Sequence, residues 1–116
     1  MIAEQDRAKM SELRAEGCVD KGLIFHVEIF AQDFYRGSDG ELFAKKDSSR
    51  NPESSLIGYV GPVVEMDDES LTIAFGYNIR NGRAFFGSPR LKIYGGAVHD
   101  YNVSAPGTTA WCKGHV

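Results

Sequence analysis

The apolar residues of this chain follow a helical period at the start and a strand period afterwards. From Ala3 to Glu16 every residue is a tolerable or good helix former, and Met10 and Leu13 fall near one face. Gly17 stands where a glycine would end the helix. We therefore predict an N-terminal helix, whose thin apolar stripe places it at the edge of the domain or makes it depend on a covering partner.

The segment from Leu23 to Ala31 is the clearest strand. Alternate residues of a strand share one side. One side of this strand is wholly apolar, and on the other side apolar residues flank His26 and Glu28. Such a pattern is typical of a strand that is covered on both faces, and the N-terminal helix or a second subunit would be the natural second cover. A homodimer is therefore compatible with the sequence.

Turn signals divide the rest of the chain into segments of strand length. Gly37-Ser38-Asp39-Gly40 is a good hairpin loop, and Asn81-Gly82 is a dipeptide typical of tight hairpins. Gly61-Pro62 interrupts an apolar segment, and because proline cannot donate to the ladder, we expect the strand to bend there. Gly95-Gly96 separates the last two predicted strands.

These elements predict a mainly β fold at the border with the α+β class. We expect an N-terminal helix followed by a small, bent antiparallel barrel or roll of six to seven short strands, since closure removes exposed edges. A helix layered on one face of an α+β sheet is the alternative. The 116 residues are the size of one domain. We divide it into an N-terminal helix (1-17), a β-rich core (21-103) and a C-terminal tail (104-116) that Trp111 would hold in place.

The composition is that of an ordinary globular protein. Hydrophobic residues make up 42% of the chain and charged residues 25%, which argues against disorder. A formal net charge of −3 gives no general attraction to nucleic acid or anionic lipid, so any basic surface must be local.

The expected location is the cytoplasm, without membrane contact. The chain begins without a basic stretch followed by an apolar one, and its apolar runs are too short to cross a bilayer. Cys18 and Cys112 lack CxxC spacing, which favours reduced thiols and leaves one bridge between them as the alternative.

His26, Glu28 and His99 are the polar residues with the best claim to a metal-binding or catalytic role. Two imidazoles and a carboxylate can bind Zn²⁺ or non-haem iron. However, a histidine and a glutamate two apart in a strand are common, and nothing in the sequence brings His99 near them. The chain also has no G-x-S-x-G elbow and no phosphate-binding glycine motif. We therefore predict no catalytic residue, no metal and no cofactor, and we favour a non-enzyme.

Residues 77-94 mix cations with aromatic residues. In a barrel such a mixture could stack unpaired bases and hold phosphates. It is equally typical of protein interfaces, where tyrosine, tryptophan and arginine dominate the binding energy. The candidate binding residues are Tyr77, Arg80, Arg83, Phe86, Arg90, Lys92 and Tyr94.

The leading functional hypothesis is a non-catalytic binding or inhibitor domain that recognises another protein through this aromatic and arginine surface. The alternative is single-stranded nucleic-acid or nucleotide binding on residues 77-94, against which the acidic net charge counts. A third hypothesis is a small-ligand pocket inside the barrel, lined by aromatic residues and His99.

Overall fold

One helix precedes nine strands in the part of the chain that the structure describes. This computed structural model describes residues 2–75, 77–80, 83–86 and 89–105. The elements are α1 (Ile2–Ala15), β1 (Ile24–Phe30), β2 (Phe34–Arg36), β3 (Leu42–Ala44), β4 (Leu56–Met66), β5 (Ser70–Ala74), β6 (Tyr77–Arg80), β7 (Arg83–Phe86), β8 (Arg90–Tyr94) and β9 (Asp100–Ser104). Two short 3-10 turns, η1 (Ala31–Asp33) and η2 (Gly95–Ala97), follow β1 and β8.

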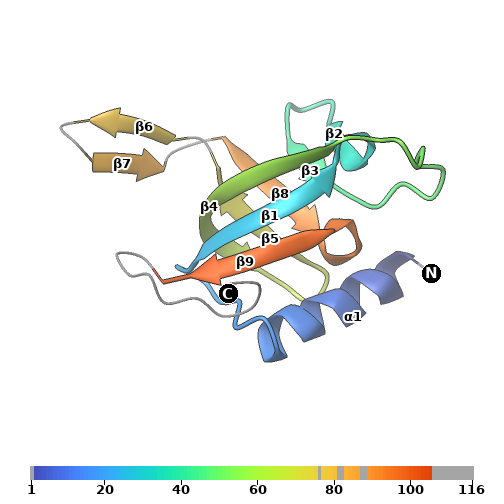
Figure 1. The fold of residues 1–116 in the computed structure, drawn as a ribbon, viewed down its shortest axis with the longest axis horizontal. Helices are drawn as coiled ribbons and strands as arrows, with labels where there is room; N and C mark the ends of the chain where they lie inside the picture. Colours follow the sequence, from blue (N-terminus) through green and yellow to red (C-terminus); the bar gives the residue numbers. More distant parts are fainter. Residues whose placement is uncertain (1, 76, 81–82, 87–88, 106–116) are drawn as a thin grey trace.

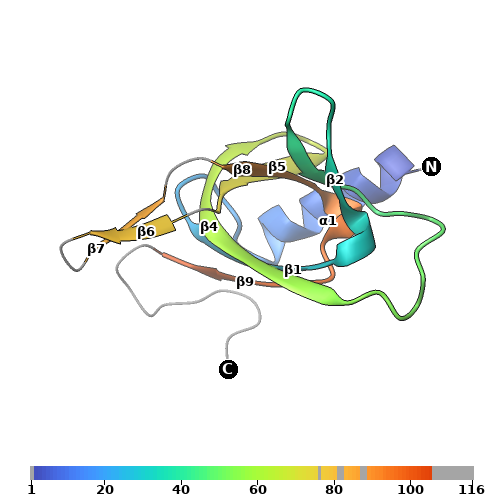
Figure 2. The same cartoon turned by 90° about the horizontal axis from the view of Figure 1, so that it is seen from above.

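Seven strands form one curved sheet in the order β2-β3-β8-β5-β4-β1-β9. Neighbouring strands run antiparallel, except that β3 and β8 are parallel. The strands β6 and β7 form a separate two-stranded sheet that extends away from the others (Figure 1). The predicted fold class is confirmed: a helix is followed by a small, bent, mostly antiparallel sheet, which curves into a roll without closing (Figure 2).

The curvature is concentrated in β4, which belongs to both halves of the roll. Its first part pairs with β1, and its last part, from Val63 onward, pairs with β5. The register shifts between Val63 and Glu65, just after the bend predicted at Gly61-Pro62. A Cβ atom on Gly61 would lie 2.1 Å from the carbonyl oxygen of Ala74, so only glycine lets the two strands approach this closely. The bend therefore depends on a residue without a side chain.

The concave side of the roll holds the hydrophobic core, and α1 packs against it. Met10 and Leu13 of α1 are fully buried in the same cluster as Phe25 of β1 and Ile93 of β8. The helix is thus a part of the core rather than a loose edge element. It does not supply the second cover expected for β1, because the opposite face of β1 points away from this core.

The approach of α1 depends on the turn η2. A Cβ on Gly95 would lie 2.4 Å from the carbonyl oxygen of Asp6. The buried Asp6 carboxylate accepts a hydrogen bond of 2.8 Å from the N–H group of Gly96. The predicted strand break at Gly95-Gly96 therefore also serves as the docking point of the helix.

The end of α1 differs from the prediction in its detail. The left-handed backbone conformation belongs to Cys18, whose φ is 57°, and not to Gly17. Gly17 is needed for another reason, because a Cβ there would lie 2.4 Å from the hydroxyl oxygen of Tyr101. Glycine at this position therefore makes room for a core tyrosine. The predicted tail with Trp111, and with it Cys112, lies almost wholly outside the described residues.

Candidate binding face

Aromatic and cationic side chains gather on the convex face of β2, β3 and β8. The hairpin β2–β3 pairs Tyr35 with Phe43, and the parallel pairing of β3 with β8 places Phe43 beside Lys92. Cross-strand partners point to the same side of a sheet, and so do alternate residues of one strand. Alternate residues along β3 and β8 therefore lie on the same face as Tyr35, Phe43 and Lys92. We call this set the aromatic-cationic face; its members are Tyr35, Phe43, Lys45, Arg90, Lys92 and Tyr94.

The aromatic rings of this face are in contact with one another or with cations. Tyr35 and Phe43 stack with their ring centroids 5.4 Å apart and their planes at 22°. The Nζ atoms of Lys45 and Lys92 lie 5.0 and 5.3 Å from the centroid of the Tyr94 ring, within the range of cation–π attraction. Tyr35 is 36% exposed, which is high for a large hydrophobic side chain. The face therefore offers partly exposed rings whose neighbours are ammonium groups.

A hollow of about 310 Å³ adjoins the stacked rings, and its lining also includes Lys46 and Asp47. Hydrogen bonds from the hydroxyl and N–H groups of Ser49 hold the pKa of the Asp47 carboxyl below its ordinary value. Loss of solvent and then the charge of Asp47 raise the pKa of the Tyr35 hydroxyl. The hollow thus contains two lysines and one carboxylate that stays ionised at neutral pH.

A second hollow, of 240 Å³, lies on the other side of Lys92 and is mostly polar. It includes Glu65 and Asp67. Partial burial acts to raise the pKa of Asp67, but hydrogen bonds from the N–H groups of Glu69 and Ser70, with the charge of Lys92, leave it below its ordinary value. Carboxylates therefore border the aromatic-cationic face on both sides.

A buried carboxylate fixes the loop that follows β3. Asp33 is fully buried; it accepts a hydrogen bond of 3.0 Å from the N–H group of Asp47, and its other oxygen lies 3.4 Å from Nη1 of Arg50. The guanidinium of Arg50 in turn lies 4.0 Å from the ring centroid of Phe30. The backbone carbonyl of Asp33 also accepts the N–H of Lys45, at 2.9 Å. These contacts position Lys45 and Asp47 beside the rings.

The structure divides the seven predicted binding residues between two places. Arg90, Lys92 and Tyr94 lie on β8 and belong to the aromatic-cationic face. The other four residues lie in the separate ribbon, and their side chains are outside what the structure describes; Tyr77 and Arg80 are on β6, and Arg83 and Phe86 are on β7.

Sequence reasoning missed three members of the face. Tyr35, Phe43 and Lys45 flank the hairpin loop Gly37–Gly40, and their alternation was a signal that they share one side. Their proximity to Lys92 and Tyr94 had no such signal, because it depends on a parallel pairing between distant segments.

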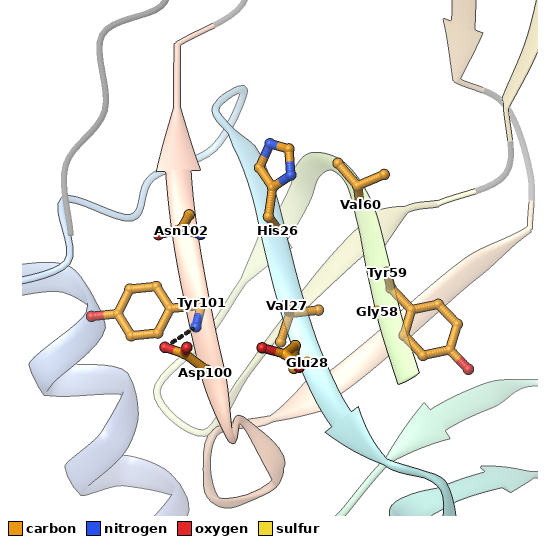
Figure 3. Close-up of a pocket in the computed structure, with 9 residues that line it drawn as sticks. All are labelled: His26, Val27, Glu28, Gly58, Tyr59, Val60, Asp100, Tyr101 and Asn102. Atoms are coloured by element: carbon orange, nitrogen blue, oxygen red, sulfur yellow. Dashed lines mark hydrogen bonds between the residues drawn. The ribbon is translucent and has the colours of Figure 1, made fainter. Parts of the chain in front are cut away.

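The residues of the predicted polar cluster lie on the other half of the roll. His26 and Glu28 line a shallow hollow of 300 Å³ on the convex face of β9, β1 and β4, together with Asp100 and Asn102 (Figure 3). Burial lowers the pKa of His26 from 6.5. The register places Glu28 directly opposite Asp100, and the two carboxylates lie side by side in Figure 3.

His99 does not line this hollow together with the other two residues. Its ring packs edge-on against Phe30, with centroids 4.9 Å apart, and the residue is exposed. Within the described ranges, no three His, Cys, Asp or Glu side chains are grouped so that they could hold a metal ion. The interior of the roll, where a ligand pocket was considered, is filled by the side chains of the core cluster.

Comparison of the chain with protein-family models, with curated proteins and with solved structures found no match. Among the described residues, no helix has the length and apolar character needed to cross a membrane.

Proposed function

We propose that this protein is a non-catalytic binding domain that recognises another protein through its aromatic-cationic face. The observation that supports this proposal best is the convergence of three strands on one partly exposed set of rings and cations. Tyr35 and Phe43 come from one hairpin, whereas Lys92 and Tyr94 come from a strand far along the chain. Tyrosine and arginine are enriched in the energetically dominant parts of protein interfaces, and this face contains both.

The rigidity of the scaffold supports the same proposal. The face lies on paired strands whose opposite side is the buried core, where Leu91 and Ile93 of β8 are fully buried. Side chains on such a sheet are held in place before a partner arrives, so binding orders fewer groups and costs less conformational entropy.

Site-specific photocrosslinking in cells tests this proposal. A photoreactive phenylalanine analogue in place of Tyr35 should capture a partner protein, whereas the same analogue in place of Gln5, an exposed residue of α1, should not. The adduct should disappear when Lys45→Glu and Lys92→Glu are added, while circular dichroism shows an unchanged fold. Equal capture from both positions, or no capture from position 35, would contradict the proposal. A second copy of this chain would be recognised as the partner from the mass of the adduct.

Single-stranded nucleic-acid or nucleotide binding is the second candidate. The specific observation in its favour is the stacked pair Tyr35 and Phe43 beside Lys45, because aromatic platforms next to cations also bind unpaired bases. Fluorescence anisotropy with a short oligothymidine, measured at two salt concentrations, tests it. Salt-sensitive binding that Tyr94→Ala and Arg83→Ala weaken would favour this candidate over the protein partner.

A further inference from the structure

We infer that the partner segment recognised by the aromatic-cationic face is an acidic stretch of polypeptide, with a carboxylate attracted by Lys45 and Lys92 and an apolar side chain on the rings of Tyr35 and Phe43. This inference rests on the proposed function and specifies the chemistry of the partner.

Lys45 and Lys92 place positive charge beside one aromatic ring. Both ammonium groups lie near one ring, that of Tyr94, at 5.0 and 5.3 Å from its centroid, so two positive charges belong to the same part of the face. A carboxylate that approaches this part of the face is attracted by both ammonium groups. Among the described residues, neither Lys45 nor Lys92 forms an ion pair within 4.0 Å. Asp67 attracts Lys92 only at a longer distance, so both ammonium groups can still pair with the carboxylate of a partner.

The stacked rings of Tyr35 and Phe43 provide an apolar surface beside Lys45. Tyr35 is 36% exposed and Phe43 is half-buried, and both line the same hollow as Lys45. A partner residue that covers these rings gains hydrophobic contact without displacing a side chain of this protein. The hollow therefore combines an apolar floor with a cationic border, which fits a peptide that alternates apolar and acidic residues.

The carboxylates around the face favour a peptide over a nucleic acid. Asp47 lies in the same hollow as the rings, and Glu65 and Asp67 lie beyond Lys92. A nucleic-acid strand carries one charge at every phosphate, so it would bring negative charges against these groups as well. A peptide can place an acidic residue at the lysines and uncharged residues elsewhere.

Selection from a library of random peptides displayed on phage, with the intact chain immobilised, tests the inference without knowledge of the natural partner. The selected peptides should be enriched in Asp and Glu next to aromatic or aliphatic residues. Lys45→Gln combined with Lys92→Gln should weaken the best synthetic peptide about tenfold, and added salt should weaken it too. Arg7→Gln combined with Arg14→Gln on α1 is the matched control, because it removes the same charge and should leave affinity unchanged.

The possible results separate this inference from the proposed function. Peptides without acidic enrichment whose binding still depends on Tyr35 and Phe43 would overturn the inference and leave the proposed function standing. Failure to select any peptide that depends on this face, or tighter binding of oligothymidine than of the selected peptides, would overturn the inference as well. The crosslinking experiment at position 35 tests the proposed function independently of the acidic character of the partner.

Discussion

The two halves of the roll present convex faces of opposite character. On β9, β1 and β4, the carboxylates of Glu28 and Asp100 lie directly opposite each other beside His26. On β2, β3 and β8, lysines surround aromatic rings, and Lys45 and Lys92 share the ring of Tyr94. The net charge of −3 of the whole chain therefore does not indicate the local charge of either face. Local chemistry, and not the total charge, indicates which side of this protein meets a partner.

The two faces are separated by the bend in β4. The core below them is continuous, since Phe25 on one half and Ile93 on the other belong to one cluster. The halves thus share their stability while their outer surfaces point in different directions (Figure 2). Substitutions at the bend, in the loop that follows β3 and on each face test this contrast.

The largest effect is expected from Gly61→Ala, which acts on the boundary between the two faces. The new Cβ would lie 2.1 Å from the carbonyl oxygen of Ala74, so the backbone must shift and the bend must open. We expect a loss of about 3 kcal/mol in the free energy of unfolding, measured with urea. The matched control is Gly58→Ala in the same strand, where the nearest atom is 4.0 Å away. Equal effects of the two substitutions would show that the bend does not need a glycine.

Arg50→Met should have the second-largest effect, because it leaves the buried carboxylate of Asp33 without its cation. We expect a loss of about 2 to 3 kcal/mol in the free energy of unfolding. Arg7→Met is the control, since its pair with Glu69 is exposed and should contribute less than about 1 kcal/mol. Adding Asp33→Asn to Arg50→Met should recover a part of the loss. A wild-type unfolding midpoint for Arg50→Met would refute the role assigned to this pair.

Neutralising one charge on each face should shift the stability in opposite directions. Glu28→Gln relieves the repulsion with Asp100 and should stabilise the fold by about 0.5 kcal/mol. Lys92→Gln removes the attraction to Asp67 and to the Tyr94 ring, and it should destabilise the fold by about 0.5 kcal/mol. Thermal unfolding at low and high salt measures both, and high salt should reduce both shifts. Shifts of the same sign would contradict the assigned contrast between the faces.

The smallest effect concerns the pH dependence of the face that contains His26. Burial lowers the pKa of His26 in the folded protein, so the unfolded chain binds a proton more readily. The stability of the wild type should therefore fall, relative to that of His26→Gln, as the pH drops below about 6.5, the ordinary pKa of histidine. Above this range the difference between the two proteins should be constant. Urea unfolding at several pH values measures it, and a difference that does not change with pH would contradict the lowered pKa.

The sequence predicted individual elements better than it predicted the site. The segment from Leu91 to Tyr94 was correctly predicted as a strand, and Lys92 and Tyr94 were named as binding candidates. Tyr35 and Phe43 were not identified, because their segments are short and the relevant contact is with a distant strand. His99 was grouped with His26 and Glu28, but the structure places its ring against Phe30. Strand order, and not local pattern, decides which of these residues are neighbours.

Local patterns in the sequence predicted the helix, the strands, their turns and the glycine-dependent bend, because each depends on neighbouring residues and on backbone preferences that act locally. Only the packing of the folded chain placed β3 parallel to β8 and docked α1 on Gly95 and Gly96. It also put Glu28 and Asp100 on one convex face and Lys45 and Lys92 on the other. Strand order is selected by how the buried sides pack together. The outward residues are carried to their positions by that packing, so their own pattern in the sequence cannot specify which of them will meet.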